Sequence, residues 1–178
     1  MSKLQDKIAV IIGGGSWIGK EIAKKYASEG SKIFIAGLTL SKLKQTVNEI
    51  VDSGGTATCE QLDVRDEEQV ANFFKKIETQ HGQIDILVNS AAVYPRSTID
   101  SLKLSEWKEV IDTNLTGAFI VLKYADDNKI DRAFLYSNIV TYFWLSILIL
   151  FSIIYIKIFR KRCMKLAPEA AKKIQTSV

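Results

Sequence analysis

The chain has few of the side chains that bind metals or form disulfides. Its 178 residues include one histidine, His81, and two cysteines, Cys59 and Cys163, which form no Cys-x-x-Cys pair. Structural zinc sites usually need four closely spaced Cys or His ligands, so we predict no metal site. So few cysteines also favour a reducing compartment over a secreted, disulfide-stabilised protein.

The N-terminal residues do not form a secretory signal. Residues 2–7 are polar, and the apolar run at 8–12 is too short for the hydrophobic part of such a signal. We therefore expect the main part of the chain to face the cytoplasm. Its length is sufficient for one domain that buries a core without disulfides.

The net charge of +4 is unevenly distributed. Residues 139–178 carry seven Lys or Arg and one Asp or Glu, a net charge of +6, and the first 138 residues hold the other 17 basic and 19 acidic groups, a net charge of −2. The larger part therefore lacks the basic surface of a nucleic-acid-binding protein, and we predict no nucleic-acid partner.

Up to residue 124, short apolar runs alternate with amphipathic segments. Nearly continuous apolar runs separated by single helices are typical of parallel strands covered on both faces. The sequence therefore predicts a doubly wound, Rossmann-like α/β fold. The expected strands are 8–12, 32–36, 56–62 and 84–88, the expected helices 20–29, 41–51, 67–81 and 105–124, the N-caps Ser41, Asp66 and Ser105, and the helix ends Gly30, Gly54 and Gly82.

A glycine-rich stretch, "GGGSWIGK", follows the first expected strand from Gly13 to Lys20. Such a loop lets the backbone approach a phosphate, and the following helix N-terminus offers free N–H groups. The stretch also matches the GxxxxGK core of an NTPase loop, but Glu21 replaces the Ser or Thr that would hold magnesium. A tight turn without a ligand is the remaining alternative. We favour a dinucleotide-binding loop.

Over residues 5–124 the chain resembles the short-chain dehydrogenase/reductase family. The family's TGxxxGxG loop corresponds to residues 12–19, and "LDV" (62–64), "NSAA" (89–92) and "NLTGAF" (114–119) follow in the family's order. The resemblance implies NAD(P)-dependent hydride transfer to or from a small alcohol or carbonyl substrate. It implies cofactor contacts at Gly13, Gly15, Ser16, Ile18, Gly19, Leu38, Asp63, Val64, Asn89 and Ala91, with Asp63 at the adenine, and catalytic roles for Asn114 and Ser137.

Some of these residues have simpler explanations, and the loop departs from the family pattern. Asp63 can start a turn before the cap at Asp66, and Asn114 can bond a neighbouring backbone carbonyl. Ile12 replaces the threonine that braces the family's loop, and Trp17 replaces its middle glycine. The indole must point to solvent, lie over the cofactor or block the site. We expect weakened binding.

The cofactor preference rests on the residue after the second strand. Leu38 is neither the arginine of many NADP-dependent relatives nor the acid of NAD-dependent ones, and Lys42 lies within reach of a 2′-phosphate. The absence of a repelling acid slightly favours NADP.

The family's Tyr-x-x-x-Lys pair is missing. In the family the tyrosine transfers the proton and the lysine lowers its pKa, but none of the six tyrosines here has a lysine four residues later. We expect a fifth strand at 132–138 and lost or severely impaired oxidoreductase activity.

The segment 133–156 contains no charged residue. About 20 apolar residues suffice to span a bilayer. We predict an NAD(P)-binding domain at 1–138, a hydrophobic and possibly membrane-spanning helix at 139–159, and a basic tail at 160–178. A buried helix and a frameshift or read-through of a truncated gene are the alternatives. A non-catalytic, membrane-anchored dinucleotide-binding module is the second functional hypothesis, and the oligomeric state stays open.

Overall fold

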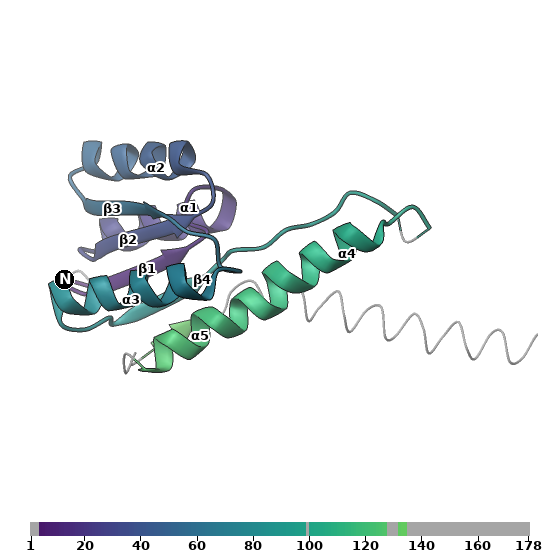
Figure 1. Cartoon of the computed structure of the whole chain (residues 1–178). Coiled ribbons are helices and arrows are strands. Elements are labelled where there is room, and N and C mark those ends of the chain that lie inside the picture. The colour runs from purple at the N-terminus through teal and green to yellow at the C-terminus, as the bar shows by residue number, and fades with distance from the viewer. Residues whose placement is uncertain (1–3, 99, 128–131, 135–178) are drawn as a thin grey trace, which may run out of the picture. The chain divides into compact units, whose positions relative to one another are not determined.

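The computed structural model describes residues 4–98, 100–127 and 132–134, all of which belong to one compact unit, Met1–Asn138. A parallel sheet is covered by helices on both faces (Figure 1). In chain order the elements are β1 (Ile8–Ile12), α1 (Trp17–Ser28), β2 (Lys32–Gly37), α2 (Leu40–Asp52), β3 (Thr56–Gln61), α3 (Glu67–His81), β4 (Ile86–Asn89), α4 (Leu104–Val110), the π-helical η1 (Ile111–Thr116), α5 (Gly117–Asp127) and β5 (Arg132–Phe134).

The five strands lie in the order β3-β2-β1-β4-β5, and every neighbouring pair is parallel. The chain runs outward from β1 to β3 and then returns to the other side of β1 for β4. In sheets of this kind, ligands bind at the carboxyl ends of the strands where the order reverses. Ile12 pairs with Ala36 on β2 and with Asn89 on β4, so these strands end at the same edge.

The first strand contributes to two cores. Ile8, Val10 and Ile12 pack with side chains of α3 and α5, whereas Ala9 and Ile11 pack with those of α1 and α2. Side chains alternate between the faces of a strand, and both faces of β1 are covered. This explains why the strand is apolar at every position and confirms the predicted doubly wound arrangement.

The three predicted glycine helix ends and the predicted N-cap at Asp66 are confirmed by the structure. Gly30, Gly54 and Gly82 follow or cap the predicted helices in the left-handed region, with φ of +87°, +83° and +82°. Asp66 caps α3, because its carboxylate accepts a hydrogen bond from the backbone N–H of Gln69 at 3.0 Å.

The other two N-caps were predicted wrongly. The structure begins α2 after Thr39 and α4 after Lys103, so Ser41 and Ser105 lie inside the first turns. In α4 the carboxylate of Glu106 accepts the N–H of Lys103 at 2.9 Å. This contact fixes the helix start two residues earlier than the serine suggests.

The predicted helix at 105–124 contains a π-helical segment. The helix continues from α4 through η1 into α5, and η1 buries Thr113 and Asn114. The helix packs closely against Val64 just after this segment, because a Cβ on Gly117, the first residue of α5, would lie 2.6 Å from Cγ2 of Val64. Single π turns inside α-helices are frequent at functional sites.

An ion-pair cluster joins α1 and α2. The carboxylate of Glu49 lies 2.6 Å from Nζ of Lys20 and 3.1 Å from Nζ of Lys24. Hydrogen bonds from Lys20 and then Lys24 lower the pKa of Glu49 from its ordinary value near 4.5 to about 2.

The fifth strand is present at Arg132–Phe134, paired with β4. Ser137, the hydrophobic segment at 139–159 and the basic tail at 160–178 lie outside the described residues. Among the helices that are described, none has the length and apolar character needed to cross a membrane.

Candidate functional site

The loops at the carboxyl ends of β1, β2 and β4 meet at one place. The N–H of Gly13 donates to the carbonyl oxygen of Ala36 at 2.7 Å, and the N–H of Ser90 donates to that of Ile12 at 2.8 Å. These bonds continue the sheet pairing by one residue beyond the strands. The glycine loop therefore lies against the chain that leaves β4, where the strand order reverses.

Three positions of this loop have no room for a side chain, and at Gly14 a Cβ would lie 2.6 Å from Cγ2 of Ile35. Gly13 has φ of +81°, and a Cβ there would lie 2.6 Å from the carbonyl carbon of Ser90 and 2.7 Å from the nitrogen of Ala91. A Cβ on Gly19 would collide with the carbonyl oxygen of Gly13. Only glycine permits this close packing of backbone on backbone. Gly15 faces α2 instead, where a Cβ would lie 3.2 Å from Cδ2 of Leu43.

The N-terminus of α1 is open. Ser16 is the N-cap, but its side chain makes no capping hydrogen bond, and the first turn contains no acidic residue. The free N–H groups and the helix dipole favour an anion at this end. The predicted residues Ser16, Ile18 and Gly19 all lie at this helix start.

Of the three orientations that the sequence allowed for the Trp17 indole, the structure shows the one that points to solvent. Its side chain is 85% exposed, so the indole points to solvent and does not fill the loop. The backbone is strained at this position, because Trp17, which replaces the family's glycine, adopts a left-handed φ of +51°. For a residue with a Cβ this conformation costs about 1–2 kcal/mol.

The last residue of β4 is buried and partly unpaired. Asn89 is 1% exposed, and its Oδ1 accepts the N–H of Ala91 at 3.2 Å. Its Nδ2 has no hydrogen-bond partner in the part of the chain that the structure describes. Burying an unpaired amide donor costs free energy, so this atom is free to donate to a ligand or to a water molecule.

Asn114, predicted as catalytic, is committed to the backbone. Its Oδ1 accepts the N–H of Val93 at 2.9 Å, and its Nδ2 donates to the carbonyl oxygen of Val93 at 3.0 Å. The simpler explanation, a bond to a nearby carbonyl, is therefore present in the structure. Through this pair of bonds the π-helical segment fixes the loop that follows β4.

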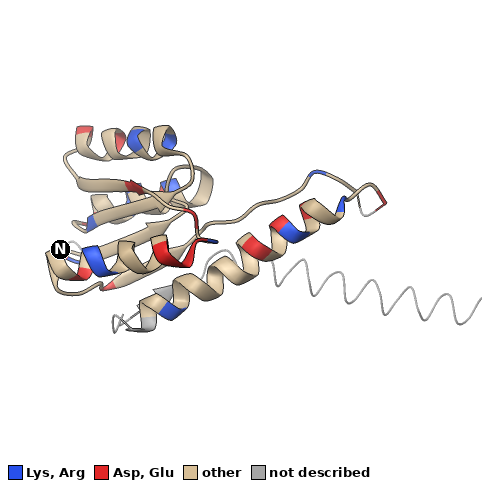
Figure 2. Cartoon of the chain, in the orientation of Figure 1, with Lys and Arg blue, Asp and Glu red and all other residues tan. Residues whose placement is uncertain are grey.

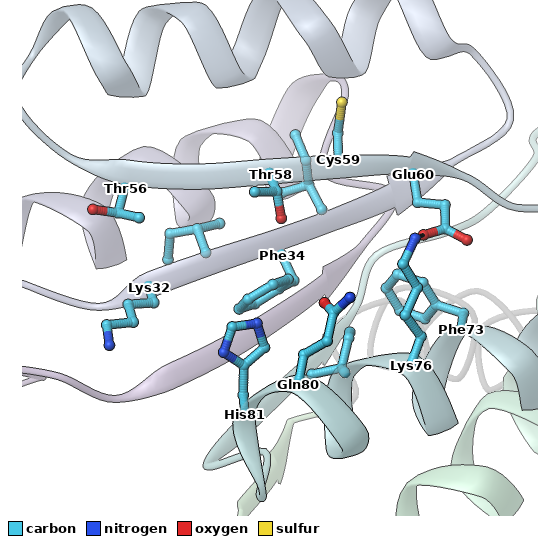
Figure 3. Close-up of a pocket in the computed structure, with 13 residues that line it drawn as sticks. Lys32, Phe34, Thr56, Thr58, Cys59, Glu60, Phe73, Lys76, Gln80 and His81 are labelled. Atoms are coloured by element: carbon cyan, nitrogen blue, oxygen red, sulfur yellow. Dashed lines mark hydrogen bonds and ion pairs between the residues drawn. The ribbon is translucent and has the colours of Figure 1, made fainter.

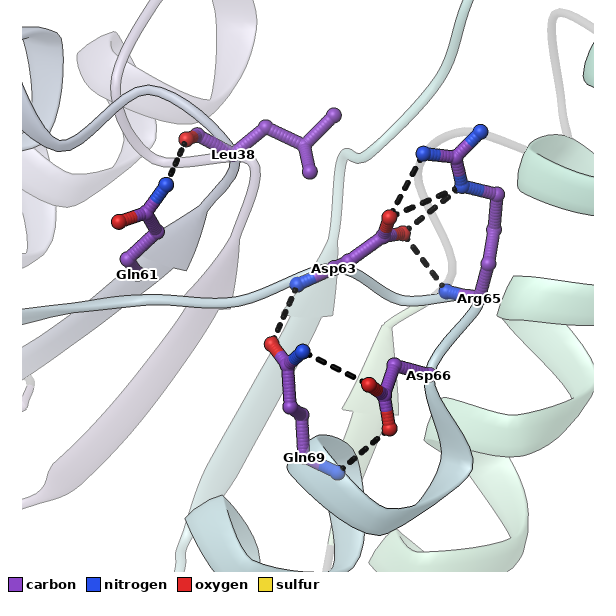
Figure 4. A network of polar contacts seen from close by, with 6 residues as sticks. All are labelled: Leu38, Gln61, Asp63, Arg65, Asp66 and Gln69. Atoms are coloured by element: carbon purple, nitrogen blue, oxygen red, sulfur yellow. Dashed lines mark hydrogen bonds and ion pairs between the residues drawn. The ribbon is translucent and has the colours of Figure 1, made fainter.

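At the end of β3, Asp63 and Val64 behave differently. Val64 is 4% exposed and packs in the core, so only its backbone can face a ligand. The carboxylate of Asp63 is held by Arg65, with Nη2 2.6 Å from Oδ2, and this hydrogen bond lowers the pKa of Asp63 (Figure 4). The turn suggested by the sequence is also present, since the N–H of Asp66 donates to the carbonyl oxygen of Asp63 at 3.1 Å. The sequence analysis did not identify Arg65, although an arginine two residues after Asp63 could have indicated this ion pair.

Leu38 lies at the end of β2 with half of its side chain exposed. Its carbonyl oxygen accepts a hydrogen bond from Nε2 of Gln61 at 2.9 Å, which ties the end of β2 to that of β3 (Figure 4). The strand ends of β2 and β3 thus form one edge of the site, with the glycine loop beside them.

A hollow of about 310 Å³ is lined by residues of β2, β3 and α3. The ring of His81 lies 4.7 Å from that of Phe34, and Lys76 forms an ion pair of 2.6 Å with Glu60 (Figure 3). None of the predicted site residues lines this hollow. Within the described residues, no group of three His, Cys, Asp or Glu side chains is placed to hold a metal.

Comparisons with known proteins agree with this geometry. The family model described as short chain dehydrogenase matches residues 7–132. An "Uncharacterized oxidoreductase" of Thermotoga maritima is 36% identical over 129 residues, which cover 72% of this chain and 50% of the relative. The structure of a citronellol catabolism dehydrogenase from Pseudomonas aeruginosa PAO1 matches with a TM-score of 0.65 and 32% identity, over 71% of this chain and 52% of that one.

An actinorhodin polyketide ketoreductase variant, solved with NADPH, matches with a TM-score of 0.64 and 30% identity, over 70% of this chain and 48% of that one. This chain thus spans about half the length of the relatives that it matches. The family match extends from the first strand to the fifth and includes the whole glycine loop. The chain therefore belongs to the short-chain dehydrogenase family.

Proposed function

We propose that the chain binds NAD(P)(H) at the carboxyl ends of β1 to β4. The observation that carries the proposal is the open glycine loop, where Gly13 and Gly19 leave only backbone beside an uncapped helix N-terminus. Backbone N–H groups in this position stabilise phosphate charge. The unpaired Nδ2 of Asn89 adds a buried donor at the adjoining strand end.

The strand order suggests how the cofactor is divided among these residues. The loop at 13–19 is suited to the pyrophosphate, and the ends of β2 and β3, with Leu38 and Asp63, to the adenosine half. Asn89 at the end of β4 and Ala91 just after it are then left for the nicotinamide half. NADP is slightly favoured over NAD, because Leu38 brings no negative charge and Lys42 is exposed nearby.

The family's reaction is hydride transfer between a nicotinamide ring and an alcohol or carbonyl group, and the bound cofactor would donate the hydride to a carbonyl or accept it from an alcohol. We infer that this chain has little of that activity, since no tyrosine has a lysine four residues later. A positioned proton donor is typically worth ~10²–10⁴-fold in rate. Asn114 contributes by holding the loop at Val93, with one hydrogen bond on each of its two polar side-chain atoms.

Two measurements on the full chain test these proposals. Calorimetric titration with NADPH and NADH should give saturable binding to the wild type and none to Gly13→Ala. A panel of ketones and aldehydes should give no NADPH oxidation above background. Absence of saturable binding to the wild type overturns the cofactor proposal. Rapid oxidation that Asn114→Ala abolishes overturns the inference of impaired activity.

The second candidate, a membrane-anchored dinucleotide-binding module, rests on the uncharged sequence at 133–156. Carbonate extraction of membranes from cells expressing the tagged chain separates the two candidates. Retention in the pellet supports the anchored module, and release into the supernatant argues against it.

A further inference from the structure

The edge strand β3 has one covered face and one open face. Ala57 and Cys59 pack with side chains of α1 and α2. Successive residues point to opposite faces of a strand, so Thr56, Thr58 and Glu60 point the other way. There they line the hollow of about 310 Å³, together with side chains of β2 and α3 (Figure 3). Thr56 and Thr58 are exposed, so α3 leaves this face of the strand open.

The floor of the hollow is largely aromatic. Phe34 on β2 is half-buried, and Phe73 and Ile77 of α3 are 3% and 2% exposed. The ring of His81 lies 4.7 Å from that of Phe34, with 54° between the ring planes. Aromatic rings attract one another at centroid distances of about 4.5–7 Å, so a further ring has partners here. Ligand pockets measure about 300–1,000 Å³, so this volume suits a small aromatic compound.

Polar side chains with unused hydrogen-bonding capacity surround this floor. Thr58 from β3 and Gln80 from α3 point toward the space beside Phe34 (Figure 3). Neither side chain, nor that of Lys32 or Thr56, has a hydrogen bond or ion pair within the residues that the structure describes. A ligand that brings acceptor atoms can therefore bind here without breaking an existing contact.

The charges that line the hollow do not cancel. Glu60 and Lys76 form an ion pair of 2.6 Å between β3 and α3. Basic residues occur at the start of β2 and on α3 (Figure 2), and the one at the start of β2, Lys32, lines the hollow without an acidic partner in the described part of the chain. Lys32 pairs in register with Thr56, so an ammonium and a hydroxyl group come from neighbouring strands at the same end of the hollow. Both groups can donate to a carboxylate, which only accepts.

We propose that the hollow is a binding site for small aromatic carboxylates. The ring packs against Phe34 and His81, and the carboxylate accepts hydrogen bonds from the side chains at the strand starts, Lys32 and Thr56. Phe34 follows Lys32 by two residues on the same face of β2, roughly 6.6 Å along the strand, so a ring over Phe34 leaves its carboxylate within reach of the flexible ammonium. The cofactor residues proposed above lie at the other ends of these strands. The site is therefore separate from the glycine loop and does not depend on the proposed function.

The test compares phenylacetate with phenylacetamide, which has nearly the same shape but no charge. His81 is the only histidine of the chain, so the ring protons of one residue report on the hollow in proton NMR spectra. Titration of the full chain with phenylacetate should shift these resonances saturably. Phenylacetamide should bind about threefold or more weakly, as expected for the loss of one exposed ion pair.

Three variants identify the groups responsible. Lys32→Gln should give equal affinities for the two compounds, because the uncompensated charge is removed. Lys44→Gln, at an exposed lysine of α2 outside the hollow, is the matched control and should keep the wild-type ratio. Thr58→Trp fills the hollow from the open face of β3 with a residue that suits a strand, and it should abolish the shift at His81.

A ratio of affinities is insensitive to a uniform loss of folded protein, so the lysine variants separate charge recognition from stability. An unchanged His81 signal, a shift that Thr58→Trp retains, or equal affinities of the wild type for both compounds would overturn the proposal. Added NADPH should leave phenylacetate bound. Displacement by NADPH would show that the probe occupies the cofactor site and would also overturn it, whereas failure of NADPH to bind contradicts only the proposed function.

Discussion

The left-handed backbone of Trp17 predicts an unusual order of stabilities among variants at this position. The indole is 85% exposed, so replacing it removes little buried surface. With φ of +51°, any residue with a Cβ is strained by about 1–2 kcal/mol. Glycine avoids this strain but costs about 0.5–1 kcal/mol in backbone entropy relative to alanine. We therefore expect Trp17→Gly to be more stable than Trp17→Ala by about 0.75 kcal/mol, the difference between the midpoints of these ranges.

Urea unfolding followed by circular dichroism measures this difference. With slopes of about 1–3 kcal/mol per molar urea, a difference of about 0.75 kcal/mol separates the midpoints by roughly 0.25–0.75 M. The loss of the indole is common to both variants, so it cancels in the comparison. The affinity for NADPH should be unchanged in either variant, because the indole lies in solvent.

The neighbouring residue Ile18 supplies the control. It is also exposed, at 47%, but its φ is not positive. There alanine should be more stable than glycine, by about 0.5–1 kcal/mol. An alanine variant at Trp17 as stable as the glycine variant would refute the reasoning, as would the same order of stabilities at both positions.

Three further predictions concern the loop, the π-helical segment and the helix pair. Gly13→Ala should lower the free energy of unfolding by at least about 1–2 kcal/mol, whereas Gly37→Ala, whose Cβ would lie 3.7 Å from its nearest neighbour, should be nearly neutral in thermal unfolding. Asn114→Asp should cost about 1–3 kcal/mol in urea, because it sets a carboxylate oxygen against the carbonyl oxygen of Val93; an unchanged midpoint would contradict the bonds described for Asn114. Because the pKa of Glu49 is lowered to about 2, its contribution is present above pH 4.5 and is lost as the pH falls from 4.5 toward 2. Glu49→Gln should remove that part of the pH dependence of stability, and identical acid profiles would argue against the two lysine contacts.

Much of the fold follows from short-range patterns. The apolar run of β1, the glycine after each of three helices and the cap at Asp66 depend on residues within one turn or one strand. Strand burial and helix termination depend on nearby residues of the chain, so they can be predicted from the sequence. The caps at Ser41 and Ser105 were wrong because several polar residues near a helix start compete, and packing decides which one is used.

The candidate site is divided in the same way. The sequence by itself determined the glycine loop, since Gly13 and Gly19 fit a strand-to-helix turn that admits no Cβ. The direction of the Trp17 indole and the bonds of Asn114 to Val93, 21 residues away, depended on how distant segments meet. Parallel strands are joined by long crossovers, so residues that touch at the sheet edge are far apart in the chain, and only the tertiary structure brings them together.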